Sequence, residues 1–227
     1  MLALISKDFA VQKRSLLLFL MIGLIIFFSF GLMEDAGMMT LIFPVFVVGY
    51  SFVNRSLYED ERNHSLRLLL AFPLARKQLV RAKYASVALF FLALILLFWL
   101  IGGFMGLNDV AGEPGLSFLV LSGTIFGFVL LVSIYLPIAY KVGMIRAQTV
   151  QRFLFIGLFA LGTSAGAVFT RLGKETGGPP PWLNDLLEQA AKLNVSVYSL
   201  VLLALSVVLY LASMSLSIRF FERRELF

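Results

Sequence analysis

Long apolar runs alternate with short polar stretches along the whole chain. Six of these runs contain no Asp, Glu, Lys, Arg or His, and each is 18 to 26 residues long. At ~1.5 Å per residue, a helix of this length crosses a hydrocarbon core of ~30 Å. The pattern therefore predicts six transmembrane helices, at residues 15–33, 36–54, 84–107, 115–140, 153–170 and 195–218.

The first fourteen residues have the pattern of a helix that lies at the membrane surface. One helical face carries Leu2, Ile5 and Phe9, and the charged residues Lys7, Asp8, Lys13 and Arg14 lie largely elsewhere. We interpret residues 1–14 as an amphipathic interfacial helix, with an extension of the first span as the alternative. A cleaved signal peptide is disfavoured, because the apolar run is longer than such a peptide needs.

A second surface helix is predicted before the last span. Residues 177–181 read Gly-Gly-Pro-Pro-Pro and cannot continue a helix, whereas residues 182–193 place Trp182 and Leu186 on a face opposite the acidic side chains. The Trp suits the interfacial level of a membrane. This outer helix either gates the release of cargo, through Trp182 and Leu186, or is a passive interfacial helix.

Composition agrees with a single transmembrane domain over residues 1–227. Hydrophobic residues make up 60% of the chain and charged residues 14%, and the mean hydropathy is +0.93. These values indicate an all-α integral membrane protein. The chain has no cysteine and a single histidine, His64, so thiolate metal sites and histidine clusters are excluded. We expect no metal site and no catalytic residues.

The charges are distributed unevenly between the two predicted sides of the membrane. Residues 1–14, 55–83, 141–152 and 219–227 contain 16 Lys and Arg and 6 Asp and Glu, and the remaining loops contain 3 and 7. The positive-inside rule places the basic side, with both termini, in the cytoplasm. The same rule explains the net charge of +6 without a nucleic-acid partner.

The apolar runs exclude several self-contained mechanisms. Ion-coupled transporters and intramembrane proteases usually need ionisable groups inside their spans, and the six runs have none. No G-x-x-x-x-G-K-[ST] loop occurs, so the chain has no such loop to bind a nucleotide phosphate. If ATP drives this protein, another polypeptide binds the ATP.

The polar stretch at residues 59–83, here the coupling segment, is the longest on the basic side. Its first part places Leu66, Leu69 and Leu70 on one helical stripe. Pro73 disfavours helix at Phe72, so we expect a bend there and a new helix that starts near Arg76 and continues into the third span. A helix, a bend and a second helix suit contact with a soluble partner, in which Leu69 or Phe72 is the buried anchor. Packing of the Leu stripe against the undersides of the spans is the alternative.

These residues resemble the ABC-2 type permeases, in which an acidic residue, a Leu pair, a proline, an arginine and a lysine recur between the second and third spans. The matching positions are Glu61, Leu69, Pro73, Arg76 and Lys83. The six spans, the amphipathic start and the outer helix extend the resemblance over essentially the whole chain. Two positions depart from it: Ser65 replaces a frequent Gly, and Ala75 replaces a Ser or Thr that can cap the third span.

The resemblance implies a permease subunit of an ATP-driven exporter. Its partners are a second permease, expected to be an identical copy, and two cytosolic ATPase subunits that bind the ATP and Mg; this chain binds no cofactor. The implied ATPase-coupling residues are Glu61, Leu66, Leu69, Phe72, Pro73 and Arg76. The subfamily it most resembles exports amphipathic peptides such as the phenol-soluble modulins across the bacterial plasma membrane.

Glycines and Phe-rich spans add two expectations about assembly and cargo. The family's permeases meet mainly through the first and fifth spans, so Gly162 and Gly166 are candidate dimer residues, with packing inside one subunit as the alternative. Uncharged spans rich in Phe suit an amphipathic or apolar cargo, such as a peptide, drug or lipid-like molecule. The other function classes are a membrane scaffold or assembly factor, and an enzyme that uses Glu59, Asp60, Glu61 and His64.

Overall fold

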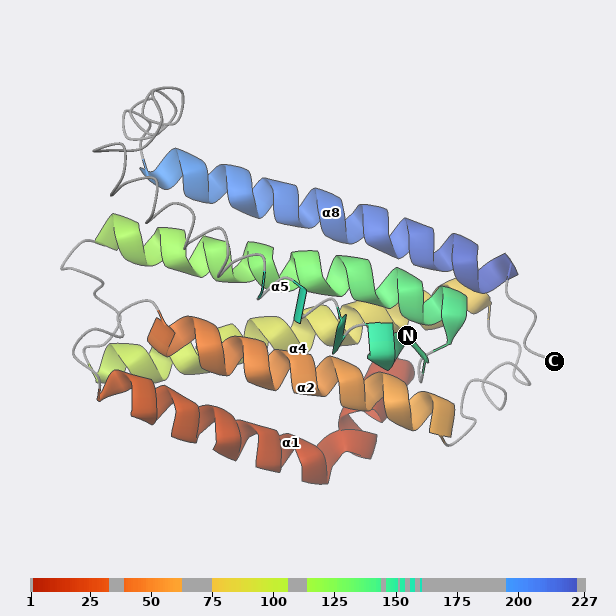
Figure 1. The fold of residues 1–227 in the computed structure, drawn as a ribbon, viewed down its shortest axis with the longest axis horizontal. Helices are drawn as coiled ribbons and strands as arrows, with labels where there is room; N and C mark the ends of the chain where they lie inside the picture. The colour runs from red at the N-terminus through yellow and green to blue at the C-terminus, as the bar shows by residue number, and fades with distance from the viewer. Residues whose placement is uncertain are drawn as a thin grey trace.

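The computed structural model describes residues 2–32, 39–62, 75–105, 114–143 and 195–223, together with 146–150, 152–153, 156–157 and 160. Five long helices account for most of these residues: α1 (Leu2–Gly31), α2 (Met39–Arg62), α4 (Arg76–Phe104), α5 (Pro114–Val142) and α8 (Val195–Arg223). They run side by side (Figure 1), and all five are long and apolar enough to cross a membrane. The prediction of an all-helical membrane protein is confirmed.

The helices are longer than the predicted spans. Helix α2 continues beyond residue 54, the predicted end of the second span, as far as Arg62. An ion pair between Arg55 and Glu59, one helical turn apart, supports these last turns of α2. At the amino end, α1 is one continuous helix that includes the predicted amphipathic start, and Figure 1 shows its first turns set at an angle to the rest.

The predicted fifth span lies mostly outside the described residues. The chain is helical at positions 152–153, 156–157 and 160, and the remainder of residues 153–170 is not described. The outer helix predicted at 182–193 also lies outside them. The number of six spans and the outer helix therefore stay predictions.

Helix α4 contacts α1, α2 and α8, while α5 packs along α8. Aromatic rings fill the spaces between these helices: Phe52 stacks on Phe90 with 3.9 Å between ring centroids, and Phe91 stacks on Phe128 at 3.8 Å. In a bilayer, helices associate through such close packing because lipid tails are as apolar as the side chains. Buried Phe residues therefore connect α4 to α2 and α5.

Small side chains let two pairs of helices approach closely. The face of α8 toward the bundle carries buried serines, at Ser199, Ser206, Ser213 and Ser217. On α2, a β-carbon at Gly49 would lie 2.7 Å from a ring carbon of Phe128 on α5. A larger residue at position 49 would push the two helices apart, so Gly49 serves packing inside one subunit.

The start of α4 lacks a side-chain cap. Ala75 has the extended backbone of an N-cap residue, with φ −68° and ψ 136°, but no side-chain oxygen bonds to the first turn. We expect Ala75→Ser to raise the free energy of unfolding by about 1 kcal/mol, because the hydroxyl accepts a hydrogen bond from an unpaired backbone N–H. Denaturant unfolding in micelles measures the change. Ala75→Val, which adds bulk without an acceptor, should give no gain; equal stability of the two variants would contradict the prediction.

Candidate functional site

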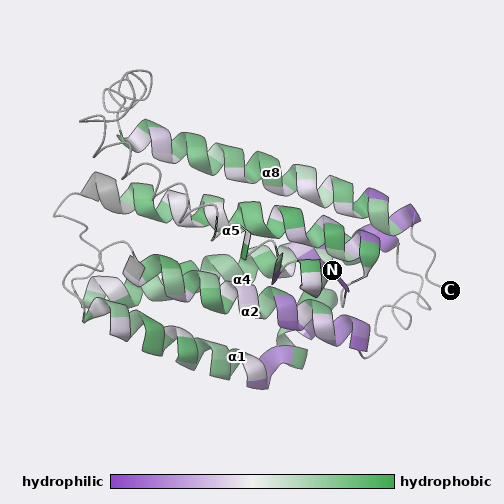
Figure 2. Ribbon diagram, viewed as in Figure 1, coloured by the Kyte–Doolittle hydropathy of each residue, from purple (hydrophilic) through white to green (hydrophobic). Residues whose placement is uncertain are grey.

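Hydrophilic residues collect at one end of the bundle. Figure 2 shows hydrophilic turns at the start of α1 and at the ends of α2 and α8 on the same side. The start of α4 lies there too, because Arg76 of α4 donates hydrogen bonds to the carbonyl oxygens of Phe221 and Glu222 at 3.3 and 3.1 Å. These four helix ends belong to the segments that the charge distribution assigns to one side of the membrane. The structure brings their described residues together.

Four charged side chains at this end form a buried ion-pair network, consisting of Lys7, Asp8, Asp60 and Lys83. Lys83 is at its centre: its Nζ lies 3.0 Å from Asp8 Oδ1 and 2.5 Å from Asp60 Oδ2. Lys7 Nζ donates to Asp60 Oδ1 at 2.7 Å. The side chains of Lys83 and Asp8 are only 6% and 7% exposed. The network therefore connects α1, α2 and α4 within the protein interior.

Two serines complete the hydrogen bonding of the network. Lys83 Nζ donates to Ser56 Oγ at 2.5 Å, and Ser86 Oγ donates to Asp8 Oδ2 at 2.7 Å. A buried charge is tolerated when its partners and hydrogen bonds replace the water it has lost. With two positive and two negative groups, the network is neutral and its buried ions are paired.

The residue next to Lys83 connects α4 to the opposite side of the bundle. The hydroxyl of Tyr84 lies 2.7 Å from both Ser213 Oγ and Ser217 Oγ of α8. The hydroxyl of Tyr210, also on α8, donates a hydrogen bond to the backbone oxygen of Tyr84 at 2.6 Å. Neighbouring positions of α4 therefore bind α1 and α2 through charges and α8 through hydroxyl groups.

The cavity beside the network is too small for cargo. It has a volume of ≈ 20 Å³ and is lined by residues that include Leu4, Asp60, Lys83 and Tyr140. A polar cavity of this size has room for about one water molecule. The chemistry available here is ion pairing between helices, and among the described residues no group of His, Cys, Asp or Glu is arranged to bind a metal ion.

Two residues of the network lie on the helices that flank residues 63–75 of the coupling segment. Asp60 is in the last turn of α2, which ends at Arg62, and Lys83 is within the first eight residues of α4, which begins at Arg76. The ion pair between Asp60 and Lys83 therefore joins the helices on either side of residues 63–75. Lys77 adds an ion pair to Glu222 of α8 at 3.5 Å.

The structure describes two of the predicted site residues. Glu61 is partly buried in the last turn of α2, and Arg76 begins α4 as predicted and binds the end of α8. The other predicted residues lie outside the described part of the chain: Leu66, Leu69, Phe72 and Pro73 of the coupling segment, the glycines Gly162 and Gly166, and Trp182 and Leu186 of the outer helix.

The sequence reading did not find the network. The sequence pattern places Lys83 in a motif, Asp8 away from the apolar face of the first helix, and Asp60 in the coupling segment, and it does not bring the three together. The available signal was the proximity of Asp60 and Lys83 to the predicted span ends, where a charged residue needs a partner. Glu59 and Asp60, which the alternative enzyme would use, are engaged in ion pairs with Arg55 and Lys83.

The fold and the network define a multi-pass α-helical membrane protein whose helices are connected by ion pairs at one end. Residues 3–222 match the ABC-2 family transporter proteins, so the chain belongs to that family. Its members are membrane components of ABC transporters and typically work with a separate ATPase subunit. No curated protein matches the chain.

Proposed function

We propose that the chain is the permease subunit of an ATP-driven exporter and that residues 63–75 receive the movement of a cytosolic ATPase. The ion pair between Asp60 and Lys83 is the observation that carries the proposal. It connects the two helices that flank these residues to each other and to α1. A displacement of residues 63–75 therefore acts on a connected set of three helices.

The free energy needed to switch between two conformations is similar in size to the free energies of buried ion pairs and apolar contacts. Moving a two-state equilibrium from 1:99 to 99:1 takes about 5.5 kcal/mol of differential interaction. Removal of one partner from a buried ion pair costs about 3–5 kcal/mol, because it leaves a buried charge unpaired, whereas an exposed pair contributes ~0–1 kcal/mol. Rearrangement of the network between two states, together with an apolar anchor such as Leu69 on the ATPase, supplies energy of the required order.

The proposed subunit composition, location and cargo follow from the resemblance to exporters of amphipathic peptides. Two identical permeases and two ATPase subunits, which bind the ATP and Mg, would form the transporter in a bacterial plasma membrane. The uneven charge distribution supports an orientation with both termini in the cytoplasm. Spans dominated by apolar residues support a cargo that is itself amphipathic or apolar.

The coupling role predicts that Leu69→Asp lowers the recovery of the ATPase with the purified permease by at least about tenfold, because a charge replaces a buried apolar anchor. Co-purification from membranes that contain both proteins measures the effect. Leu32→Asp is the matched control, since Leu32 is 86% exposed at the opposite end of α1. Undiminished recovery with Leu69→Asp, or equal loss in the control, would remove the coupling role.

Transport itself distinguishes an exporter from a scaffold. Vesicles that contain the permease and its ATPase should move a labelled amphipathic peptide only when ATP and Mg are present. If the complex forms but no peptide, apolar drug or lipid analogue moves, the scaffold alternative replaces the exporter.

A further inference from the structure

The start of α4 lies between two groups of helices. Figure 1 shows α1 and α8 at opposite edges of the bundle, with α4 between them. The four members of the ion-pair network lie on α1, α2 and α4. A displacement at the start of α4 therefore reaches α1 and α2 through the network, and a second connection is needed to reach α5 and α8.

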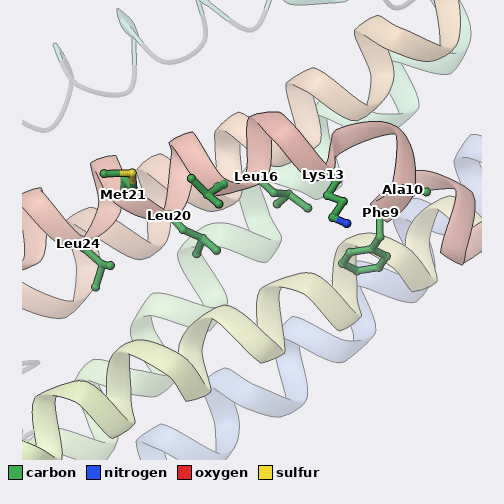
Figure 3. Close-up of a pocket in the computed structure, with 8 residues that line it drawn as sticks. Phe9, Ala10, Lys13, Leu16, Leu20, Met21 and Leu24 are labelled. Atoms are coloured by element: carbon green, nitrogen blue, oxygen red, sulfur yellow. The ribbon is translucent and has the colours of Figure 1, made fainter.

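Helix α1 leads to the expected contact between permeases. An open groove follows one side of this helix, and Figure 3 shows Leu16, Leu20 and Leu24 along it. Helix α1 contains the predicted first span, through which the resemblance implies that two permeases meet. The network thus acts on the helix that the second permease is expected to contact, whereas α8 lies at the opposite edge.

The end of α8 is held by the first residue of α4. Nη1 of Arg76 donates hydrogen bonds to the carbonyl oxygens of Phe221 and Glu222 at 3.3 and 3.1 Å. These carbonyls belong to the last turn of α8, which ends at Arg223, where the helix itself supplies no donors. The guanidinium also lies over the ring of Phe221, 6.0 Å from its centre. Arg76 therefore caps the end of α8 with a positive charge, which the helix dipole favours there.

Two aromatic rings extend this connection to α5. Phe221 is fully buried, and its ring centroid lies 5.3 Å from that of Tyr140 on α5. The ring of the adjacent Phe220 lies 5.4 Å from Nζ of Lys141. Because Tyr140 and Lys141 are consecutive near the end of α5, a displacement of the end of α8 acts on α5 as well.

Arg76 and Tyr84 hold α4 against α8 at two separate places. The Tyr84 hydroxyl contacts Ser213 and Ser217, one or two turns before the carbonyls that Arg76 binds. A single contact lets two helices pivot about it, whereas two contacts separated along the helices also fix the angle between them. With both contacts in place, a rotation of α4 is passed on to α8.

We propose that Arg76 is a positioning residue, which passes a displacement of residues 63–75 to α8 and α5. It directly follows these residues, and its planar guanidinium binds two carbonyls and an aromatic face at once, which a lysine does not reproduce. The proposal rests on the proposed function, because the ATPase is taken to act on residues 63–75. A direct contact between Arg76 and the ATPase is the competing role.

Hydrogen exchange in the permease alone tests whether Arg76 holds the end of α8. Arg76→Gln should raise the exchange rate of the amides in the last two turns of α8 by about tenfold, because the end of the helix loses its cap and opens more often. Arg81→Gln is the matched control, since Arg81 is exposed on the same helix. Unchanged exchange in Arg76→Gln, or an equal rise in the control, would overturn the proposal.

Transport by the complex tests the coupling. In vesicles that contain the permease and its ATPase, Arg76→Gln should lower the amount of labelled amphipathic peptide moved per ATP hydrolysed about fivefold. Arg76→Lys, which keeps the charge, should lie between this variant and the wild type. Loss of ATPase recovery with purified Arg76→Gln would make Arg76 a direct contact, and an unchanged ratio would leave it without a coupling role; either result overturns the proposal.

A reversible cross-link separates positioning from general stability. The chain has no cysteine, so Lys77→Cys and Glu222→Cys in the Arg76→Gln background place two thiols at side chains whose charged atoms lie 3.5 Å apart in the wild type. Joining them with a short bifunctional thiosulfonate should restore the transport ratio, and a reductant should abolish the restoration. The two single-cysteine variants are the controls. A cross-linked protein that stays uncoupled would contradict the positioning role.

Failure of the proposed function gives a different result. If the wild-type permease binds the ATPase but moves no peptide, the exporter assignment fails, and a thiol introduced as Arg219→Cys, at an exposed site near the end of α8, still decides on Arg76. We expect ATP and Mg to change the rate at which this thiol is modified, and Arg76→Gln to abolish that change. A change that persists in Arg76→Gln, or no change in either background, would overturn the proposal.

Discussion

Replacing Lys83 with Met lowers the free energy of unfolding by about 3–5 kcal/mol, because it leaves the buried carboxylates of Asp8 and Asp60 without their shared cation. Lys83 Nζ lies 3.0 and 2.5 Å from oxygens of these two residues, and its side chain is 6% exposed. Denaturant unfolding in detergent micelles measures the loss. An effect of this size would make the network a principal connection between α1, α2 and α4.

Lys77→Met is the matched control for this change. Lys77 also pairs with a carboxylate, Glu222, but the two side chains are 57% and 41% exposed, so the expected loss is below about 1 kcal/mol. Combining Lys83→Met with Asp8→Asn and Asp60→Asn should recover most of the stability, since it removes the unpaired charges. If Lys83→Met costs no more than Lys77→Met, the network does not have the assigned role.

Truncation of Phe52 to Ala should cost a similar 3–5 kcal/mol, for a different reason. Phe52 is fully buried and lies between Phe90 of α4 and Phe9 of α1, with ring centroids at 3.9 and 5.7 Å. Loss of the ring leaves a cavity at the contact of three helices, and large aromatic truncations of this kind cost about 3–5 kcal/mol. The same unfolding experiment gives the value.

The control for Phe52 is Phe104→Ala, the same chemical change at a side chain that is 91% exposed at the end of α4. We expect it to alter stability by less than about 0.5 kcal/mol. Phe52→Leu should fall between the two, because Leu fills part of the space. Similar losses for Phe52→Ala and Phe104→Ala would show that the contact between Phe52 and its neighbouring rings contributes little.

The helical class and the start of α4 were predictable because they depend on local properties. Apolar runs of membrane length give the spans, and Pro73, which disfavours helix just before it, gives a new helix at Arg76. The uncapped position at Ala75 followed from the same stretch. These features need no knowledge of residues far away along the chain.

The end of α2 and the ion-pair network were not predictable in this way. The predicted second span ends just before the first charge, Arg55, so Asp60 falls in the polar coupling segment outside it. In the structure, the charge stays on the helix because its partners Lys83 and Lys7 come from α4 and α1, the latter 53 positions away. A pattern read along one segment carries no information about such partners. The motif pointed to Lys83, but not to the carboxylates that surround it.

The order of the network along the chain has a consequence for biosynthesis. Asp8 and Lys83 are separated by 75 positions, so at ~5–20 residues per second the lysine leaves the ribosome several seconds after the aspartate. During that interval the members of the network on α1 and α2 are two carboxylates, Asp8 and Asp60, and one cation, Lys7. Nascent chains that stop before α4 therefore expose an incomplete polar surface to the insertion machinery and to proteases that remove unassembled membrane proteins.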